Sequence, residues 1–440
     1  MGGTPAGALT AAHPAEPRAN GHPSERPPIA LYVHVPFCVS ACPYCDFVVY
    51  AGAASRGPHS RVGALVEALG RELELRADLL DRRFGSSRPP LRSVYLGGGT
   101  PSLVPCREIG RLLERVASRF GIDAAAEVTL EANPGPAEIG DLAGFRSAGV
   151  TRLSIGAQSL QAGELRRLGR RHLPRDVDRA VSGARAAGFA SVSLDLLYDV
   201  PTQTLAGWQD TLERVVAMRV DHVSAYALTL DDPDDEGLTG PLGDHLPVRP
   251  GARRWRERAR RAQDDDLAAD EYLLADRLLA TAGYGWYELS NWARAGHESR
   301  HNLCYWRREP YEALGPGAHA FDGGRLRRWN AARLEPYLAA LLPPGGSSPR
   351  LPPGAFEWLD SAGVPAERAI LGLRLAEGIA PELAGDPAVA PAVGWGRRQG
   401  LLEGRPDGRV RLTPRGRLLG NEVFARIRQG DALTPRAAAC

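Results

Sequence analysis

Three cysteines stand close together near the start of the chain, in the string CVSACPYC. Cys38, Cys42 and Cys45 follow directly after the apolar run 29–35. Thiolates are soft ligands that suit zinc and iron–sulfur clusters. A [4Fe-4S] cluster normally takes four protein ligands, so three cysteines leave one iron with an open coordination position. The spacing therefore predicts a [4Fe-4S] cluster whose fourth iron can bind a small molecule.

S-adenosylmethionine suits that open position, because its amino and carboxylate groups can both bind the iron. An electron passed from the cluster to the sulfonium would then give a 5′-deoxyadenosyl radical. Tyr44, directly before the last cysteine, is placed to pack on the adenine. The alternatives are a zinc site, which would need a fourth ligand, and a loop of cysteines that bind no metal. His34 is near, but it lies within an apolar strand, where a hydrogen-bonded core histidine is the more common outcome.

Six short β-branched runs alternate with amphipathic stretches in the first half of the chain. The runs are 29–35, 93–96, 127–131, 152–155, 191–196 and 222–228, and the stretches between them include 63–80, 107–120, 136–148, 174–187 and 205–218. This alternation predicts parallel βαβ units in an α/β fold. Six units fall short of a closed eightfold barrel, so we predict a partial (β/α)6 barrel of the TIM type. Ligands should bind at the carboxyl ends of its strands.

Polar residues and glycines recur at these strand ends. The string LGGGTP closes the second strand with Gly98, Gly99 and Thr100, and glycine lets a backbone approach a ligand closely. A carboxylate at Glu131, in LEANPG, could bind a ribose hydroxyl or an ammonium group. Three further candidates follow the later strands: Gln158, Arg170 and Asp195. Each could be a solvated surface residue, but their succession favours a binding rim.

The remaining chain divides by composition. We predict a disordered segment at 1–28, the barrel at 29–250, a segment packing on the barrel at 251–341, a linker at 342–364, a C-terminal domain at 365–430 and a tail at 431–440. The segment 251–341 should begin with one long helix over about 253–282. A hairpin among helices predicts a small, mainly helical, winged-helix-like C-terminal domain. Its nine arginines between 397 and 428 leave DNA binding open as a lesser alternative, and we expect no nucleic-acid partner.

The composition excludes sites whose chemistry depends on lysine. The net charge is only +2, and all 54 basic residues are arginine. A chain without lysine has no phosphate-binding P-loop lysine and no pyridoxal Schiff base. We find no secretory signal and no apolar run long enough for a transmembrane segment, so we expect a cytoplasmic protein.

Several motifs together resemble the HemN/HemW group of radical SAM proteins. These are YVHVPFCVSACPYCDF, YLGGGTPS, LEANPG, RLSIGAQS and YELSNWARAGHESRHNLCYW, spread over about 31–321, with LGLRLAEGI and RVRLTPRG resembling the group's C-terminal domain. The group comprises oxygen-independent coproporphyrinogen III oxidases and related haem chaperones. The oxidases have a further cysteine two places after the third, where this chain has Phe47. The string HNLCYW, from His301, resembles an HNxxY signature linked to haem binding, so the chain is most similar to the chaperones.

The resemblance implies cofactors and their binding residues. It implies a [4Fe-4S] cluster on the three cysteines, S-adenosylmethionine and haem. The residues matching the S-adenosylmethionine contacts of the oxidases are Tyr32, Tyr44, Gly98, Gly99, Thr100, Glu131, Gln158, Arg170 and Asp195. His301 is the candidate haem ligand, with a hydrogen-bonded structural histidine as its alternative. His297 and His319 are lesser candidates, and Cys304 more resembles a small buried residue.

The implied function is haem delivery to a haem-requiring respiratory protein, with membrane contact only through that recipient. The alternative is oxidative decarboxylation of coproporphyrinogen III, so whether the chain is an enzyme stays open, and no catalytic residue is assigned. One departure concerns DLLYDVPTQT, where Asp199 and Thr202 replace the usual glycines. Losing two glycines there predicts a stiffer turn in which a positive φ is hindered.

Overall fold

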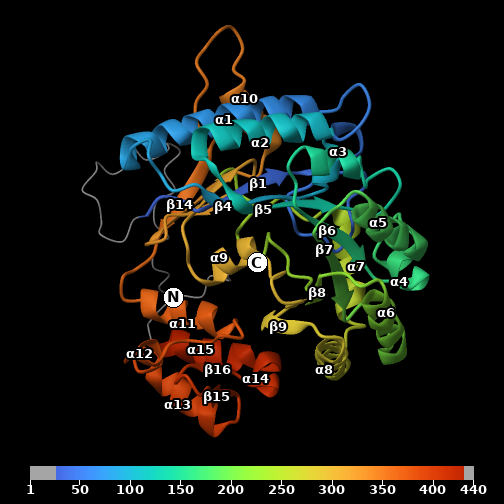
Figure 1. The fold of residues 1–440 in the computed structure, drawn as a ribbon, viewed down its shortest axis with the longest axis vertical. Coiled ribbons are helices and arrows are strands. Elements are labelled where there is room, and N and C mark those ends of the chain that lie inside the picture. The colour runs from blue at the N-terminus through green and yellow to red at the C-terminus, as the bar shows by residue number, and fades with distance from the viewer. Residues whose placement is uncertain (1–25, 431–440) are drawn as a thin grey trace.

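The computed structural model describes residues 26–430, so most of the predicted disordered segment 1–28, and the tail 431–440, lie outside the described residues. Six parallel strands form the centre of its main sheet: β1 (Ala30–Val35), β4 (Leu91–Gly98), β5 (Ile122–Ala132), β6 (Arg152–Gln158), β7 (Ser191–Tyr198) and β8 (His222–Ala227). Each pairs in parallel with the next, as β1 pairs with β4 from Ala30↔Ser93 to Val35↔Gly98. The predicted partial (β/α)6 barrel is confirmed (Figure 1).

Helices follow the strands along the chain. They pack against the outward-facing side chains of the strands and form one core with them. They are α1 (Val62–Phe84), α2 (Cys106–Phe120), α3 (Leu142–Ser147), α4 (Ala162–Arg167), α5 (Pro174–Ala186) and α6 (Leu205–Ala217). Because strand side chains alternate in direction, Leu31 and Val33 join the helix residue Leu69 in the core. Tyr32 and His34 point the other way, into the barrel, which leaves polar groups inside it.

The sheet continues beyond the six strands at both edges. Strand β11 (Tyr311–Leu314) pairs in parallel with β1, and β12 (His319–Phe321), β13 (Leu326–Asn330) and β14 (Gly354–Trp358) follow it as antiparallel strands. At the other edge β10 (Asn291–Ala293) pairs with β8, and β9 (Gly285–Glu288) pairs with β10. The segment 251–341 therefore supplies strands to both edges of the barrel sheet. The prediction that 342–364 is only a linker is wrong, because β14 lies within it.

The single long helix predicted over 253–282 is also wrong. Two helices occupy this stretch, α7 (Pro250–Arg260) and α8 (Asp265–Thr281). Asp264 has an extended backbone, and its side chain accepts hydrogen bonds from the backbone N–H groups of Asp266 and Leu267 at 3.0 and 3.1 Å. This N-cap begins a new helix, because it satisfies amides that a continuous helix would have bonded internally.

The C-terminal residues form a small unit with its own core. It comprises α11 (Val364–Leu373), α12 (Pro381–Ala384), α13 (Ala390–Arg398), the hairpin β15 (Leu402–Gly404) and β16 (Val410–Leu412), α14 (Pro414–Leu418) and α15 (Gly420–Gly430). Figure 1 shows these helices gathered at one end of the molecule, remote from α1 and α2. Arg417 donates to Asp276 of α8 at 2.8 Å and lies 4.4 Å from the ring centre of Trp286. The unit is thus docked on the barrel.

Shorter elements complete the described chain. They are β2 (Phe37–Cys38), β3 (Tyr50–Ala51), the 3-10 helices Gly52–Ala54 and Pro101–Leu103, α9 (Arg300–Trp306) and α10 (Leu334–Leu341). Within residues 26–430, no helix is both long and apolar enough to cross a membrane.

Candidate functional site

The three cysteines lie on the loop after β1, at the carboxyl end of the parallel strands. Strand β2 pairs with β3, which sets Cys38 beside Ala51, and the backbone N–H of Cys45 bonds to the carbonyl of Cys42 at 3.3 Å. All three are free thiols and are partly exposed. Thr100 donates its hydroxyl to the sulfur of Cys38 at 3.4 Å. The loop therefore presents three thiols at the edge of the sheet where a parallel barrel binds its ligands.

The surroundings of these thiols fit an iron–sulfur cluster. Burial raises the pKa of Cys38 to about 11 and also raises that of Cys45, and neighbouring thiols add to both shifts. A cationic cluster would remove this penalty, since it binds the thiolate form. Arg170 donates to the sulfur of Cys42 at 3.8 Å, and its buried Nε has no hydrogen-bond partner within the described chain. Three soft donors and a neighbouring cation thus suit a cluster held by three thiolates.

The described residues do not form a site for a single metal ion. Among residues 26–430 there is no group of three His, Cys, Asp or Glu side chains arranged to hold a metal ion.

The glycine string after β4 packs against the cysteine loop. A Cβ on Gly98, whose φ is +109°, would lie 2.3 Å from the His34 ring, and a Cβ on Gly99 would lie 2.7 Å from the carbonyl oxygen of Phe37. The backbone N–H of Thr100 donates to that same carbonyl at 2.7 Å. The backbone at Gly98 and Gly99 therefore does approach another group closely, as expected. That group belongs to the chain itself, at the start of the cysteine loop. Gly98 and Gly99 are required because they let β4 hold the start of the cysteine loop.

Glu131 lies inside the barrel next to this string. Its carboxylate accepts hydrogen bonds from the hydroxyl of Tyr95 at 2.8 Å and from the N–H of Gly98 at 2.9 Å. Burial raises the pKa of Glu131 to about 7, against the effect of both hydrogen bonds, and the charge of Asp195 raises it further. An ammonium group or a ribose hydroxyl would relieve this unfavourable charge.

A polar residue that the sequence reasoning did not single out joins the other candidates. Asn133 donates to the hydroxyl of Thr100 at 2.8 Å and accepts from the guanidinium of Arg170. Arg170 also donates to the carbonyl of Gly156 at 2.8 Å. Asn133 thus links the neighbours of Cys38 and Cys42. Its position in the LEANPG motif, two residues after Glu131, is the sequence feature that could have identified Asn133 as a candidate.

The other predicted residues fall around this centre. Gln158 ends β6 with a φ of +64°. Asp195 accepts hydrogen bonds from Ser154 at 3.1 Å, and burial raises its pKa. Tyr32 lies in the barrel, where its hydroxyl bonds to a ring nitrogen of His34 at 2.9 Å. The roles assigned to these residues stay predictions.

Tyr44 packs in another direction. Its ring lies 6.5 Å from that of Trp255 in α7, and Arg256 donates to its carbonyl at 2.8 Å. Helix α7 therefore holds the last turn of the cysteine loop, and the predicted stacking of Tyr44 on an adenine stays a prediction.

His34 is a core histidine, as its place in the strand suggested. It is 5% exposed, and its second ring nitrogen bonds to the carbonyl of Val48 at 2.9 Å. Burial lowers its pKa to about 4. Both nitrogens are engaged, so a zinc site gains no fourth ligand from His34.

His301 lies in α9, which occupies the base of the barrel. Its ring is 1% exposed and stacks on Tyr95 with 5.1 Å between ring centres. One nitrogen lies 2.9 Å from the hydroxyl of Ser93 and the other 2.7 Å from that of Tyr305. Burial lowers the pKa of His301 to about 3. This arrangement matches the structural-histidine alternative, because neither nitrogen is free to bind iron unless α9 moves.

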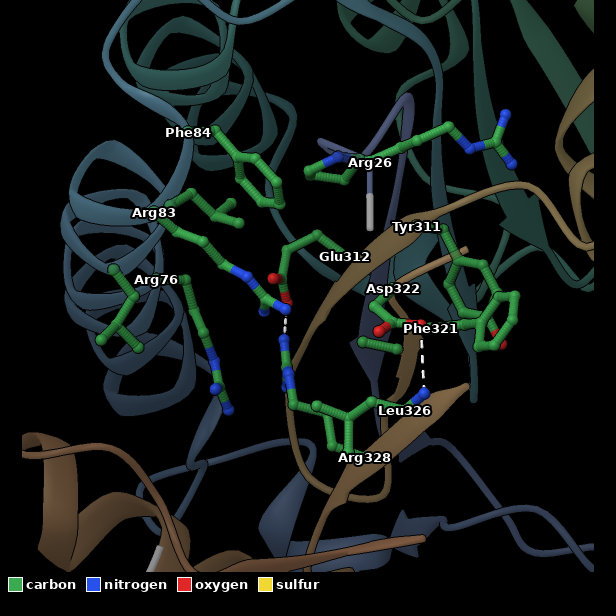
Figure 2. Close-up of a pocket in the computed structure, with 14 residues that line it drawn as sticks. Arg26, Arg76, Arg83, Phe84, Tyr311, Glu312, Phe321, Asp322, Leu326 and Arg328 are labelled. Carbon is green, nitrogen blue, oxygen red and sulfur yellow. Dashed lines mark hydrogen bonds and ion pairs between the residues drawn. The ribbon is translucent and has the colours of Figure 1, made fainter. Parts of the chain in front are cut away.

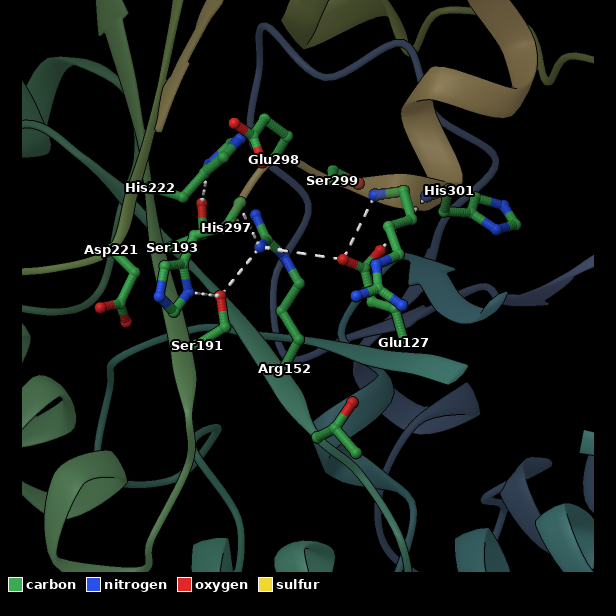
Figure 3. Close-up of polar contacts among 12 residues, drawn as sticks. Glu127, Arg152, Ser191, Ser193, Asp221, His222, His297, Glu298, Ser299 and His301 are labelled. Atoms are coloured by element: carbon green, nitrogen blue, oxygen red, sulfur yellow. Dashed lines mark hydrogen bonds and ion pairs between the residues drawn. The ribbon is translucent and has the colours of Figure 1, made fainter. Parts of the chain in front are cut away.

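A polar network holds α9 in place (Figure 3). Arg152 donates to Ser191 at 2.9 Å and to the carbonyl of His297 at 2.8 Å. The carboxylate of Glu127 accepts from the backbone N–H groups of Arg300 and His301, each at 3.2 Å. These contacts tie α9 and the residues just before it to β5, β6 and β7.

A cleft at the opposite end of the barrel strands does not belong to this site (Figure 2). It is lined by the starts of β11 and β13 and by the end of α1, including Tyr311, Arg328 and Phe84. Arg328 forms an ion pair with Glu312. The cleft thus lies away from the cysteines, and this cation already has an acidic partner.

The turn after β7 corrects one expectation. Asp199 and Thr202 adopt positive φ values of +58° and +65° although neither is glycine. The N–H of Asp199 donates to Glu271 at 2.8 Å, and Gln263 donates to the Asp199 carboxylate at 2.8 Å. These bonds hold Asp199 in the left-handed conformation that the loss of glycine was expected to hinder.

The barrel and its three-cysteine loop define a radical SAM protein, and a sequence profile of the radical SAM superfamily matches residues 32–215. The chain is 38% identical to heme chaperone HemW of Mycobacterium tuberculosis over 398 residues, which cover 90% of this chain and 94% of that protein. It is 36% identical to the Escherichia coli protein of the same name, covering 70% of this chain and 74% of that one. The chain belongs to the HemW family.

A solved structure agrees with the fold. Coproporphyrinogen III oxidase (HemN) of Escherichia coli matches with a TM-score of 0.74 over 93% of this chain and 91% of that one. The two sequences are 22% identical, so this likeness concerns the fold alone.

Proposed function

We propose that this protein is a haem chaperone that binds haem, a [4Fe-4S] cluster and S-adenosylmethionine, and passes haem to a respiratory protein. The observation that carries the proposal is the 38% identity to heme chaperone HemW over 94% of that protein's length. Phe47 supports it, because this residue stands where the oxidases have a fourth cysteine and its side chain is 56% exposed. Any membrane contact would come through the recipient.

Different residues of the site would bind different parts of the cofactors. Cys38, Cys42 and Cys45 would hold the cluster, which supplies one-electron reduction of a bound sulfonium compound. Glu131 would bind an ammonium or ribose group, since no cationic side chain among residues 26–430 pairs with its buried carboxylate. Arg170 places positive charge beside the sulfur of Cys42 at 3.8 Å. A reducing compartment such as the cytoplasm would keep the three thiols free.

Haem transfer tests this function directly. Anaerobically reconstituted full-length protein is loaded with haem and mixed with an apo-form of a haem-dependent respiratory enzyme, whose recovered activity is measured. We expect loading with a Soret shift and reactivation of the acceptor. Formation of protoporphyrinogen from coproporphyrinogen in a parallel anaerobic assay, without haem transfer, would instead establish the oxidase.

A further inference from the structure

A carboxylate flanked by two imidazoles lies beside the cysteine loop. Asp244 bonds through one oxygen to Nδ1 of His245 at 3.0 Å and through the other to Nε2 of His319 at 2.9 Å. The Asp244 side chain is only 12% exposed, whereas those of His245 and His319 are 18% and 42% exposed. The acid is therefore enclosed, and both rings reach solvent.

Strands β12 and β13, together with the insert 228–249 that joins β8 to α7, hold these three residues firmly. His319 stands on β12, and its ring stacks on Trp329 of β13 with 5.7 Å between centres and 21° between planes. The indole N–H of Trp329 donates to the carbonyl of Leu242 at 3.0 Å, which fixes the insert just before Asp244. Groups held on rigid elements keep a constant geometry, as ligand sites require.

This group borders the residues that follow the third cysteine. A Cβ on Gly317 would lie 2.7 Å from the Val48 side chain and 3.1 Å from the carbonyl oxygen of Asp244. The negative charge of Asp46 acts on His245. Phe47 lies between Asp46 and Val48 in the sequence. Its exposed aromatic ring is therefore next to the residue that acts on His245 and next to the residue that contacts Gly317.

The geometry favours a metal whose other coordination positions are filled by a non-protein ligand, because this group can offer only one nitrogen to it. Both oxygens of Asp244 are used by the imidazoles, and the described chain holds no three side chains placed to chelate one ion. A single imidazole can still bind an iron whose other positions a porphyrin fills. A carboxylate that accepts the N–H of a ligating histidine fixes its tautomer and leaves the other nitrogen free for the metal. For His245 that nitrogen is Nε2, which has no hydrogen-bond partner in the part of the chain that the structure describes.

We propose that His245, oriented by Asp244, is an axial ligand to haem iron at this edge of the barrel. This assignment rests on the proposed haem-binding function and names its site. His319 holds the second oxygen of Asp244, and the exposed ring of Phe47 would cover part of the porphyrin face.

Haem titration of anaerobically reconstituted full-length protein tests the assignment, with the Soret band and electron paramagnetic resonance as readouts. His245→Ala should weaken haem binding at least tenfold and remove the imidazole-ligated signal, and added imidazole should restore that signal. Asp244→Asn should weaken binding less. His59→Ala, at an exposed histidine in the loop before α1, is the matched control and should bind like the wild type.

The outcomes separate this inference from the proposed function. If the wild type binds haem and His245→Ala keeps its affinity and spectrum, the assignment is wrong while the function stands. Loss of the imidazole signal in His319→Ala or His301→Ala alone would likewise overturn it. If the wild type does not bind haem at all, the proposed function fails first.

Discussion

Removing the hydroxyl of Tyr95 should weaken the binding of S-adenosylmethionine, because this hydroxyl holds the carboxylate of Glu131. Tyr95 donates to one oxygen of Glu131 at 2.8 Å, while the other oxygen accepts from the N–H of Gly98. The ring of Tyr95 is in turn stacked on His301 of α9. Tyr95→Phe keeps the ring and its packing and removes only the bond to Glu131.

The size of the effect follows from that one bond. A hydrogen bond to a charged group contributes roughly 1.5–3 kcal/mol, and a tenfold change in affinity corresponds to about 1.4 kcal/mol. We therefore expect about ten- to a hundredfold weaker binding. The bond also lowers the pKa of Glu131, which burial holds at about 7, so its loss raises that pKa further. The defect should consequently be largest near pH 7 and shrink as rising pH ionises Glu131 in both proteins.

Anaerobic calorimetry of cluster-loaded protein with S-adenosylmethionine measures this effect at neutral and alkaline pH. Tyr284→Phe is the control, because the Tyr284 hydroxyl donates to the carbonyl of Val220 at 2.6 Å and has no contact with Glu131. An unchanged affinity in Tyr95→Phe would refute the reasoning. So would an equal loss in Tyr284→Phe, which would point to general destabilisation.

Three further changes test the fold. Thr202→Gly should stabilise the protein by about 0.5–1 kcal/mol in urea unfolding, because an exposed β-branched residue with a φ of +65° is strained; destabilisation would contradict this. Glu288 has a pKa raised to about 7 by burial, so the folded state keeps a proton that the unfolded state has lost, and stability falls as pH rises from about 5 to 7. In Glu288→Gln the free energy of unfolding should therefore fall by up to about 3 kcal/mol less than in the wild type over this pH range. An unaltered pH profile of stability in the variant would contradict this prediction. Arg417→Ala should weaken docking of the C-terminal unit by about 1–3 kcal/mol, since Asp276 loses its ion pair and keeps only the hydrogen bond from Trp292; hydrogen exchange in α8 should rise, and no change there would count against this contact.

The six barrel strands and the main site were accessible from the sequence because both rest on local patterns. Short β-branched runs set the strands, and the residues after them meet at one edge whatever the details of packing. The structure brings Thr100 and Arg170 beside Cys38 and Cys42 at this edge, and their binding roles stay predictions. Asn133 was not predicted, because an amide two places after Glu131 has no pattern of its own until the fold brings Thr100 and Arg170 beside it.

Other features depended on contacts between distant parts of the chain. The outer strands β9 to β14 are short, and the two that join them to the barrel, β10 and β11, pair with β8 and β1 far away in the sequence, so periodicity alone could not reveal them. His301 was a plausible ligand by its motif, yet burial against Tyr95 and bonds to Ser93 and Tyr305 depend on where α9 packs. The pair of imidazoles on Asp244 likewise joins β12 to an insert with no regular structure.

Mössbauer spectroscopy of protein reconstituted anaerobically with 57Fe, with and without S-adenosylmethionine, tests the central claim most directly. We predict a [4Fe-4S] cluster with one distinct iron whose signal changes when S-adenosylmethionine is added. Cys38→Ala should lose the cluster and Cys304→Ala should keep it, because Cys304 is buried in α9, within the base of the barrel. A zinc-loaded protein, or four equivalent irons that ignore S-adenosylmethionine, would contradict the account.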